Sequence, residues 1–342
     1  MINPIDQRGV TSIEDSFPVV KAQPVPVPRG LAAFPDTIDQ AKAPTELTPC
    51  LDSFFQKICD CLISIINTLK RFFCLSRKEE ITTVLNSFDN SEINGKINGI
   101  YITTNETGLE NTYAFLARQP KRDQPTIHIG CAAWYNLDII YARKSTYGLI
   151  VDFNPKNGEF IKKTVDLINS CESREAFKSS MIEYLHSLKG EERGLFFHPD
   201  QLGLPTDRIE EELSRKGSWL ETEESYQYIK RELVSKNRLI AITEDIRNSE
   251  KFSQIRQFLD TNGIAIDTVY ESNICNFMYR VTDKDSFVKS LKHLLDSSSI
   301  FIHCPKIKRS DDTYILLNQR AVLGEEVLAD SYDVSKFFEE VQ

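Results

Sequence analysis

The sequence predicts an α/β domain with a largely parallel, twisted sheet and helices on both faces. From about residue 81 onward, short apolar runs of strand length alternate with longer segments of helical period. Because strands separated by helices need crossover connections, neighbouring strands are expected to run parallel. The chain has 342 residues, of which 41% are hydrophobic, and can therefore form a large core with additional segments.

The expected strands are apolar runs bounded by turn residues. In order they are Thr126–Gly130, Tyr147–Phe153, Arg238–Thr243, Ala265–Glu271, Ser299–Cys304 and Thr313–Gln319. Helical periodicity occupies Leu137–Arg143, Glu159–Asn169, Ser225–Ser235, Lys251–Thr261 and Asp285–Leu295. Residues at about 190–225 are too many for an ordinary connection, so we expect a helical insertion that acts as a lid or a substrate-side element.

The N-terminal residues differ in composition from the domain at residues 80–342. Residues 1–49 are rich in proline and lack periodicity, which predicts a disordered or extended leader. Residues 50–79 place apolar side chains at helical spacing and predict an amphipathic helix. Its uncharged run, Cys61–Leu69, is far shorter than the ~20 residues needed to cross a bilayer. Residues 50–74 are expected either to contact a membrane surface or a protein, or to pack on the domain.

Charge and cysteine content narrow the classes of partner and compartment. The chain carries 41 Lys and Arg against 50 Asp and Glu, a net charge of -9, so no nucleic-acid partner is expected. The eight cysteines have neither zinc-ligand spacing nor a dense disulfide pattern, so we expect no metal site. A cytoplasmic location is expected, with membrane association through the amphipathic helix as an alternative. Charges near the N-terminus argue against a Sec signal peptide and leave non-Sec delivery to a host open.

Candidate site residues follow from the ends of the expected strands. These ends carry Gly130, then Asp152, then Glu244 and Asp245, then Glu271, Ser272 and Asn273. Ligands of parallel sheets bind outside the carboxyl ends of the strands, where the strand order reverses. An acid about 20 residues after a glycine turn can accept hydrogen bonds from ribose hydroxyls, so Asp152 is predicted to hold a nucleoside. The alternative is that Asp152 caps the helix that follows it.

The order of several short motifs over roughly residues 85–305 carries a family resemblance. They are "NETGLENTY" (Asn105–Tyr113), Asn136 in "GCAAWYN", "IVD" (Ile150–Asp152), "SWLETEESYQYIKREL" (Ser218–Leu233), "ITEDI" (Ile242–Ile246) and "VYESNI" (Val269–Ile274). In this order they resemble the class I methyltransferase-like fold, which is Rossmann-like. Within that fold they resemble an uncharacterised bacterial family of methyltransferase-like proteins first represented by a Leptospira protein.

The resemblance implies an S-adenosylmethionine-dependent methyltransferase-like protein, although it does not indicate the methyl acceptor. It implies that Gly130 marks the cofactor turn, that Asp152 binds the ribose and that Asp245 lies near the adenine. The implied cofactor-binding residues are Gly130, Asn136, Asp152, Glu244, Asp245 and Ser272. Asn273 is the candidate catalytic residue, at the meeting point of methyl donor and acceptor, and has an alternative role in a turn or helix cap. A strand-end mouth lined by acids that include Glu271 would suit the positive sulfonium.

The chain departs from the class I pattern at the glycine turn. Ala132 stands where such enzymes usually have a second glycine, and Trp134 and Tyr135 follow it. A Cβ at this position and bulky aromatic side chains beyond it are expected to crowd the methionine end of the cofactor. Two functions therefore stay open. One is a methyltransferase, and the other is a noncatalytic scaffold for protein or membrane-surface contact, which includes an effector delivered by a bacterium.

Overall fold

The computed structural model describes most of the domain that the sequence predicts. The described residues are 80–93, 99, 102–104, 106–132, 134–188, 205–278, 280–304, 306–308, 314–316 and 319–329. All of them belong to one of the chain's two compact units, Ser64–Gln342. The predicted leader at 1–49 and the amphipathic helix at 50–79 lie outside the described residues. No helix in the described part of the chain is long and apolar enough to cross a membrane.

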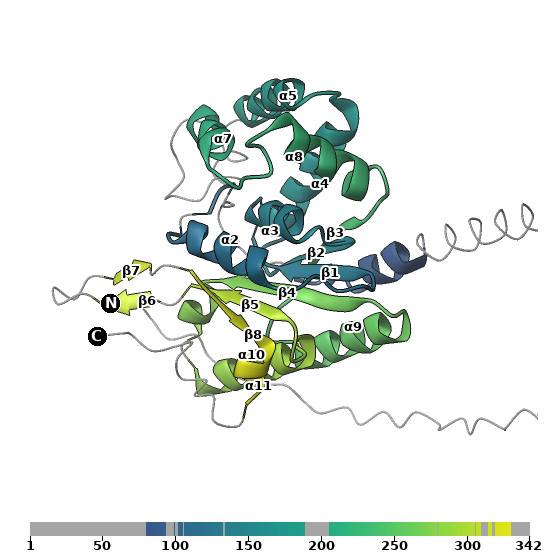
Figure 1. Ribbon diagram of the computed structural model, residues 1–342, viewed down its shortest axis with the longest axis vertical. Coiled ribbons are helices and arrows are strands. Elements are labelled where there is room, and N and C mark those ends of the chain that lie inside the picture. The colour runs from purple at the N-terminus through teal and green to yellow at the C-terminus, as the bar shows by residue number, and fades with distance from the viewer. Residues whose placement is uncertain are drawn as a thin grey trace, which may run out of the picture. The chain divides into compact units, whose positions relative to one another are not determined.

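A six-stranded sheet forms the centre of the domain (Figure 1). Its order is β3 (Leu239–Thr243), β2 (Tyr147–Asp152), β1 (Thr126–Gly130), β4 (Ala265–Ser272), β5 (Ile300–His303) and β8 (Arg320–Leu323). The first five strands run parallel, and β8 pairs antiparallel with β5. β1 to β5 are buried along nearly their whole length, which explains why they appear in the sequence as continuous apolar runs.

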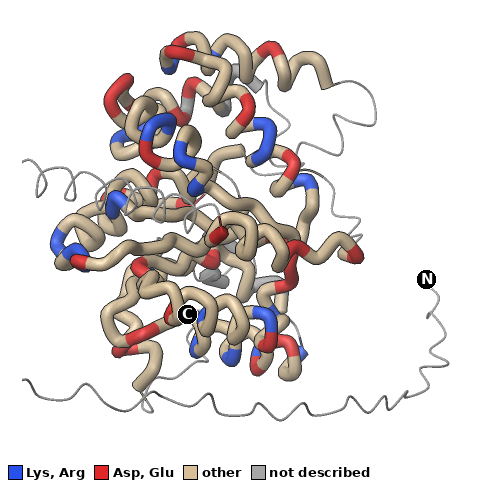
Figure 2. The backbone as a smooth tube through the Cα atoms, turned by 90° about the vertical axis from the view of Figure 1, so that its right-hand side faces the viewer, with Lys and Arg blue, Asp and Glu red and all other residues tan. Residues whose placement is uncertain are grey.

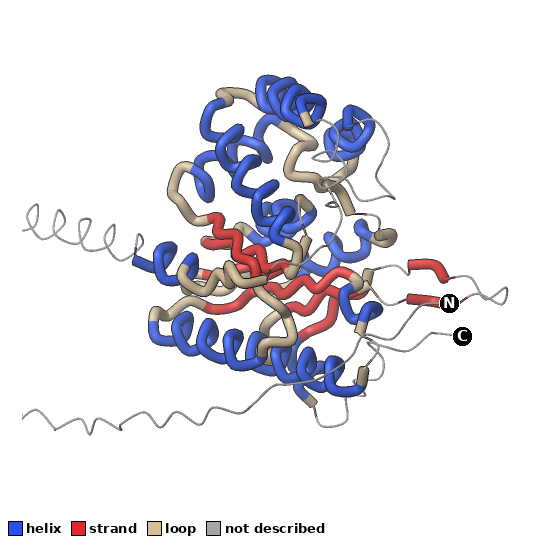
Figure 3. Tube along the Cα trace, turned by 180° about the vertical axis from the view of Figure 1, so that it is seen from behind, coloured by secondary structure: helices blue, strands red, loops and turns tan. Residues whose placement is uncertain are grey.

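Helices cover both faces of the sheet, as Figures 1 and 3 show. One face carries α2 (Leu109–Arg118), α3 (Tyr135–Arg143) and α4 (Pro155–Ser170), and the other carries α9 (Ser249–Thr261), α10 (Val281–Leu294) and the helical residues 80–86. This architecture confirms the predicted Rossmann-like class I methyltransferase fold. The strand order reverses between β1 and β4, so the carboxyl ends of these two strands mark the switch point of the sheet.

The helices that follow β2 and β3 begin with asparagine caps at the carboxyl edge of the sheet. The side chain of Asn154 accepts a hydrogen bond from the backbone N–H of Lys156, and Pro155 occupies the first helical position of α4. The side chain of Asn248 accepts from the backbone N–H of Lys251 at the start of α9. These caps fix where the chain turns from strand to helix, which positions the side chains between them.

The connection from β2 to β3 contains a helical insertion that extends beyond α4. Its described elements are α5 (Arg174–Ser187), α7 (Pro205–Ser214), α8 (Glu223–Tyr228) and a π-helix, η2 (Ile229–Val234). Trp219 and Phe177 of this insertion pack against Trp134, with ring centroids 5.6 and 6.0 Å from the Trp134 ring. The insertion therefore adds a second aromatic core on the side of α3 and α4 that faces away from the sheet.

A buried ion network also holds this insertion to α3. Arg215 donates to Asp138 at 2.6 Å and also contacts Glu212, and both carboxylates are fully buried. The Trp219 backbone N–H donates to the second oxygen of Asp138 at 2.7 Å, and Ser218 donates to Glu212 at 2.9 Å. One guanidinium thus compensates two buried carboxylates from different segments.

The C-terminal strands differ from the prediction. The expected strand Thr313–Gln319 corresponds to the shorter β7 (Tyr314–Leu316), which pairs with β6 (Lys306–Lys308) in a separate two-stranded sheet. The last strand of the main sheet is instead β8, which the sequence analysis missed. Strands of this length contain too few residues for an alternation of apolar and polar side chains to reveal them.

Candidate functional site

A cleft of about 440 Å³ opens at the carboxyl edge of the sheet, beside the switch point. Apart from Gly99, it is lined by residues at or just after the ends of four strands. The lining residues are Gly99, Cys131, Ala132, Val151, Asp152, Phe153, Asn154, Asn157, Glu244, Asp245, Ile246, Arg247, Ser272, Asn273, Ile274 and Met278. Of the predicted site residues, the cleft brings together Asp152, Glu244, Asp245, Ser272 and Asn273. Gly130 and Asn136 are not among its lining residues, and both are buried in the core.

Gly130 and Asn136 form part of the core under the turn after β1. The side-chain amide of Asn136 donates to the Cys131 carbonyl at 2.8 Å, and its Oδ1 lies 2.9 Å from Nε2 of His128. A Cβ on Gly130 would lie 2.0 Å from Asn136 Oδ1, so only glycine fits there. The glycine is thus explained by packing against Asn136, whereas the sequence analysis explained it by the approach of a ligand.

His128 is a neutral member of this buried group. Because Asn136 Oδ1 can only accept, Nε2 of His128 carries the proton, and Nδ1 accepts from the Thr268 hydroxyl at 2.7 Å. Burial lowers the pKa of His128 to about 4. The imidazole therefore stays uncharged and braces β1 against β4.

The turn after β1 has an unusual backbone. Ala132 has φ 66°, in the left-handed region that favours glycine. Its N–H donates to Oδ2 of Asp152 at 2.8 Å, and Asp152 also accepts from the Asn154 N–H and the Asn157 amide, both at 2.8 Å. Burial raises the pKa of Asp152, although these three hydrogen bonds lower it. Asp152 thus stabilises the strained turn. It is also the residue that the sequence predicts to bind a ribose.

Replacing Ala132 by Gly is expected to raise the free energy of unfolding by about 0.5–1 kcal/mol. Glycine removes a left-handed penalty of about 1–2 kcal/mol and loses part of that gain to backbone entropy. The measurement is urea unfolding at a fixed pH. Ala142→Gly, within the helix α3, is the matched control and should destabilise by about 1 kcal/mol. Equal losses in both variants would contradict a strained turn.

The aromatic residues beyond Ala132 do not reach the cleft. Trp134 is fully buried and donates from its indole N–H to Thr164 at 3.0 Å. Tyr135 is buried against Tyr270 and donates to Gln319 at 2.7 Å. The expected crowding by these two rings is therefore absent, and the Ala132 methyl group remains at the described part of the turn.

Glu244 and Asp245, which follow β3, have different environments. Glu244 is 1% exposed, and its Oε1 accepts from the Asp245 N–H at 2.8 Å. Its Oε2 has no hydrogen-bond partner among the described residues. Asp245 forms an ion pair with Arg247, which also contacts Asp283 of α10 at 3.1 Å. Glu244 therefore keeps one buried acceptor without a donor in the described part of the chain, whereas Asp245 is already neutralised.

The end of β4 holds a carboxylate that the sequence analysis did not single out. Ser272 lines the cleft with φ 60° and donates from its hydroxyl to the buried Glu106. Tyr270 donates to the same Glu106 oxygen at 3.0 Å, and the Gln319 amide donates to the other. Burial raises the pKa of Glu106 despite these donors. Glu106 is separated from Ser272 by 166 residues, so no local signal in the sequence connects them.

Glu271 does not line the cleft, contrary to the expectation from its position at a strand end. Its side chain is fully buried and accepts from the Cys275 N–H at 3.1 Å. Because side chains alternate along a strand, Glu271 lies on the opposite face of β4 from Tyr270. Burial raises the pKa of Glu271 to about 8.

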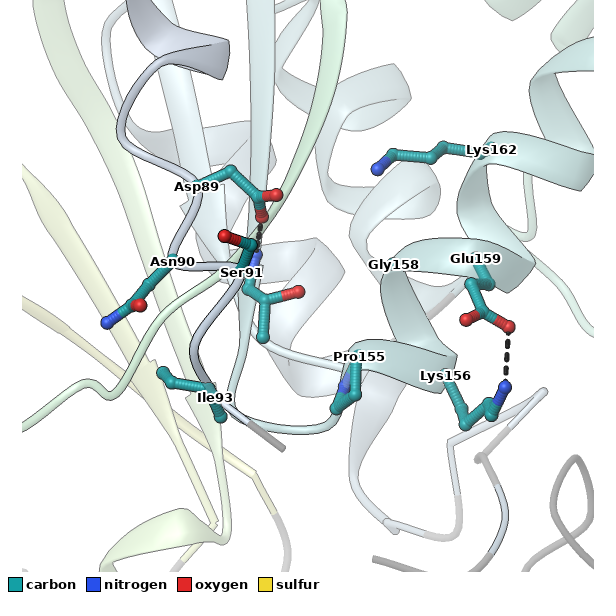
Figure 4. A pocket seen from close by; sticks show the side chains of 10 residues that line it. Asp89, Asn90, Ser91, Ile93, Pro155, Lys156, Gly158, Glu159 and Lys162 are labelled. Carbon is teal, nitrogen blue, oxygen red and sulfur yellow. Dashed lines mark hydrogen bonds and ion pairs between the residues drawn. The ribbon is translucent and has the colours of Figure 1, made fainter. Parts of the chain in front are cut away.

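A second cavity, of about 450 Å³, lies between the residues that follow 80–86 and the start of α4. Asp89, Asn90 and Ile93 form one wall, and Lys156 and Glu159 are paired with each other on the other wall (Figure 4). Lys156 is therefore neutralised by Glu159, and Lys162 is a second lysine that lines this cavity. Figure 2 shows Lys and Arg interspersed with Asp and Glu along the described backbone. Within the described residues, no group of three or more His, Cys, Asp or Glu is arranged to hold a metal ion.

The insertion between β2 and β3 does not contribute to the cleft in its described part. None of its described residues from α5 to η2 is among the lining residues. They pack instead on α3 and α4. The lid expected from the sequence is therefore not formed by these elements, and residues 189–204 lie outside the described residues.

Comparison with known proteins shows the family. The model of a family described as Domain of unknown function (DUF7790) matches residues 101–189 and 202–313. The chain belongs to this family. No curated protein matches the chain.

Solved structures of the glycopeptide N-methyltransferase MtfA are similar to part of the chain. The sinefungin complex has a TM-score of 0.24 and 9% identity over 66% of this chain and 73% of its own. The complex with S-adenosyl-L-methionine has a TM-score of 0.24 and 8% identity, over 65% of this chain and 69% of its own. A further MtfA structure has a TM-score of 0.23 and 8% identity, over 67% of this chain and 79% of its own. TM-scores of this size carry no argument about function.

Proposed function

We propose that the cleft binds S-adenosylmethionine and that the protein is a methyltransferase-like protein whose acceptor is unknown. The observation that carries this proposal is the convergence of four strand ends on one cleft at the switch point. Its volume of about 440 Å³ falls in the range of small-molecule sites. The motif resemblance to the bacterial methyltransferase-like family first represented by a Leptospira protein supports the same proposal.

The charges and shape of the cleft fit this cofactor. Asp152, Glu244 and Asp245 outnumber Arg247 among its lining residues, which favours a ligand with positive charge. Phe153 is 39% exposed beside the cleft and offers an aromatic face to a planar base. The unpartnered Oε2 of Glu244 can accept a hydrogen bond from an amino group or a hydroxyl.

When bound, S-adenosylmethionine would supply a methyl group activated by a sulfonium. The residues of the chain contribute by positioning the reactants, which is the main source of rate in such a transfer. Asp152 and Phe153, at the end of β2, would hold the nucleoside part. At the end of β4, Ser272 would contact the cofactor and Asn273 would orient the acceptor. The acids of the cleft would favour the positive charge.

Calorimetric titration of S-adenosylmethionine and S-adenosylhomocysteine into the full chain tests the proposal. We expect micromolar binding by the wild type. Phe153→Ala should weaken it about tenfold, because a stacking contact worth about 1.4 kcal/mol is lost. Glu159→Gln, on α4 and outside the cleft, is the control and should bind like the wild type.

Asp152→Ala should abolish measurable binding, and its unfolding midpoint must be measured alongside because Asp152 also stabilises the turn at Ala132. The proposal is rejected if the wild type binds neither compound at millimolar concentration.

The alternative function is a noncatalytic scaffold for contact with a protein or a membrane surface. One observation favours it: the carboxylate of Asp152 is already occupied by three donors of the protein, one of them from the left-handed Ala132. In this alternative, residues 50–74 would provide the contact. A wild type that binds no nucleoside would support it.

A further inference from the structure

Asn157 is a buried polar residue of the cleft without an assigned role. It lies in the first turn of α4, lines the cleft and is 5% exposed. Its Nδ2 donates to Oδ2 of Asp152 at 2.8 Å. Since a carboxylate only accepts, this contact fixes which end of the amide is nitrogen. Its Oδ1 is left buried without a hydrogen-bond partner among the described residues. A buried acceptor without a donor is costly and needs an explanation.

Asp152 cannot by itself accept hydrogen bonds from both hydroxyls of a ribose. A carboxylate has about four acceptor positions, two on each oxygen. The Ala132 N–H and the Asn157 amide fill those of Oδ2, and the Asn154 N–H takes one position of Oδ1. One position remains on Oδ1, whereas a vicinal diol brings two donors.

Asn157 supplies the missing acceptor next to Asp152. The hydrogen bond between the two side chains holds the amide beside the carboxylate, both residues line the cleft, and each side chain keeps an acceptor position that no donor of the described residues fills. We propose that Asn157 and Asp152 together recognise the 2′,3′-diol of a ribonucleoside, each accepting from one hydroxyl. This inference rests on the proposed nucleoside cofactor and adds Asn157 as a residue that determines specificity for ribose.

Calorimetry with nucleosides that differ by one hydroxyl tests this proposal on the full chain. The probes are adenosine, 2′-deoxyadenosine and 3′-deoxyadenosine, together with S-adenosylhomocysteine. The wild type should bind adenosine at least tenfold more tightly than either deoxynucleoside. In Asn157→Ala, adenosine should bind about tenfold more weakly, and the preference over one of the two deoxynucleosides should fall to about one. Glu159→Gln, which lies on the same helix but outside the cleft, should keep both preferences.

The outcomes separate this inference from the proposed function. If the wild type binds S-adenosylhomocysteine and Asn157→Ala keeps both preferences, the role of Asn157 is wrong and the cofactor proposal stands. If adenosine binds with the diol preference but S-adenosylmethionine and S-adenosylhomocysteine do not, the cofactor proposal fails and the ribonucleoside site stands. A wild type that binds none of the probes overturns both.

A folding control completes the test. The urea unfolding midpoint of Asn157→Ala without ligand should lie close to that of the wild type, because the variant loses one hydrogen bond but also removes an unpaired buried acceptor. Asn157→Ser provides a second variant with a short side chain that keeps a hydroxyl. It should bind adenosine more tightly than Asn157→Ala does, because the hydroxyl can still accept from the ligand. Equal adenosine affinities in the two variants would speak against a hydrogen bond at this position.

Discussion

Replacing Arg143 by Met should lower the free energy of unfolding by about 3–5 kcal/mol, because the buried Asp267 loses its bidentate partner and keeps only Arg122, at 4.0 Å. Arg143 donates to both oxygens of Asp267, at 2.8 and 2.9 Å, and both side chains are almost fully buried. Its remaining donors reach the carbonyls of Leu116, Gln119 and Pro120. One guanidinium thus joins the end of α3, the segment after α2 and β4. Urea unfolding of the two proteins measures the difference.

Two comparisons show whether the loss comes from the buried charge. In Arg143→Met/Asp267→Leu, no charge is left unpaired, so much of the lost stability should return. Lys236→Met breaks an exposed pair with Glu232 and should change stability by less than about 0.5 kcal/mol. If the double variant is as unstable as the single one, the carbonyl contacts of Arg143 matter more than Asp267.

The stability difference between Glu271→Gln and the wild type should grow by several kcal/mol between about pH 5 and pH 8. Burial raises the pKa of Glu271 from 4.5 to about 8, so in this window the folded protein keeps a proton that the unfolded chain releases. The folded state then binds more protons, and its stability falls as the pH rises. Each pKa unit is worth about 1.4 kcal/mol. Glutamine stays neutral and removes this loss.

Urea unfolding of both proteins at several pH values provides the test. Other groups that titrate in the same window, among them Glu212, whose pKa burial raises to about 7, are present in both proteins and cancel in the difference. Below about pH 4.5 the difference should no longer change with pH, because Glu271 is then protonated in both states. Parallel stability curves from pH 5 to pH 8 would mean that Glu271 does not titrate as its burial requires.

The first five strands of the sheet could be predicted from local sequence to within one or two residues. Ile127 and Ile129 of β1, like Ile150 and Val151 of β2, belong to short apolar runs bounded by turn residues. Strands buried on both faces require such runs, so the pattern is visible without any partner. The order of the strands follows only from how they pair. The strand β8 was missed because its 4 residues are too few to show an alternation of apolar and polar side chains.

Residues of the cleft could be predicted from the sequence where their position at the end of a strand is enough to place them there. The carboxyl ends of parallel strands meet at one edge, which brought Asp152 and Glu244 into one cleft. Glu271 also stands at a strand end, but its side chain lies on the other face of the strand and is buried in the core. Position at a strand end therefore places a residue at the edge but does not determine which way its side chain points.

The sequence by itself determined the alternation of strands and helices, the sheet with parallel strands and the acids at its carboxyl edge, because these depend on residues that are neighbours in the chain. Only the tertiary structure decided what each polar side chain does. Asp152 binds the N–H of Ala132, 20 residues away, and Glu106 accepts from Ser272, 166 residues away. The physical reason is that a buried polar atom needs a partner, and the fold chooses that partner from segments that are far apart in the sequence.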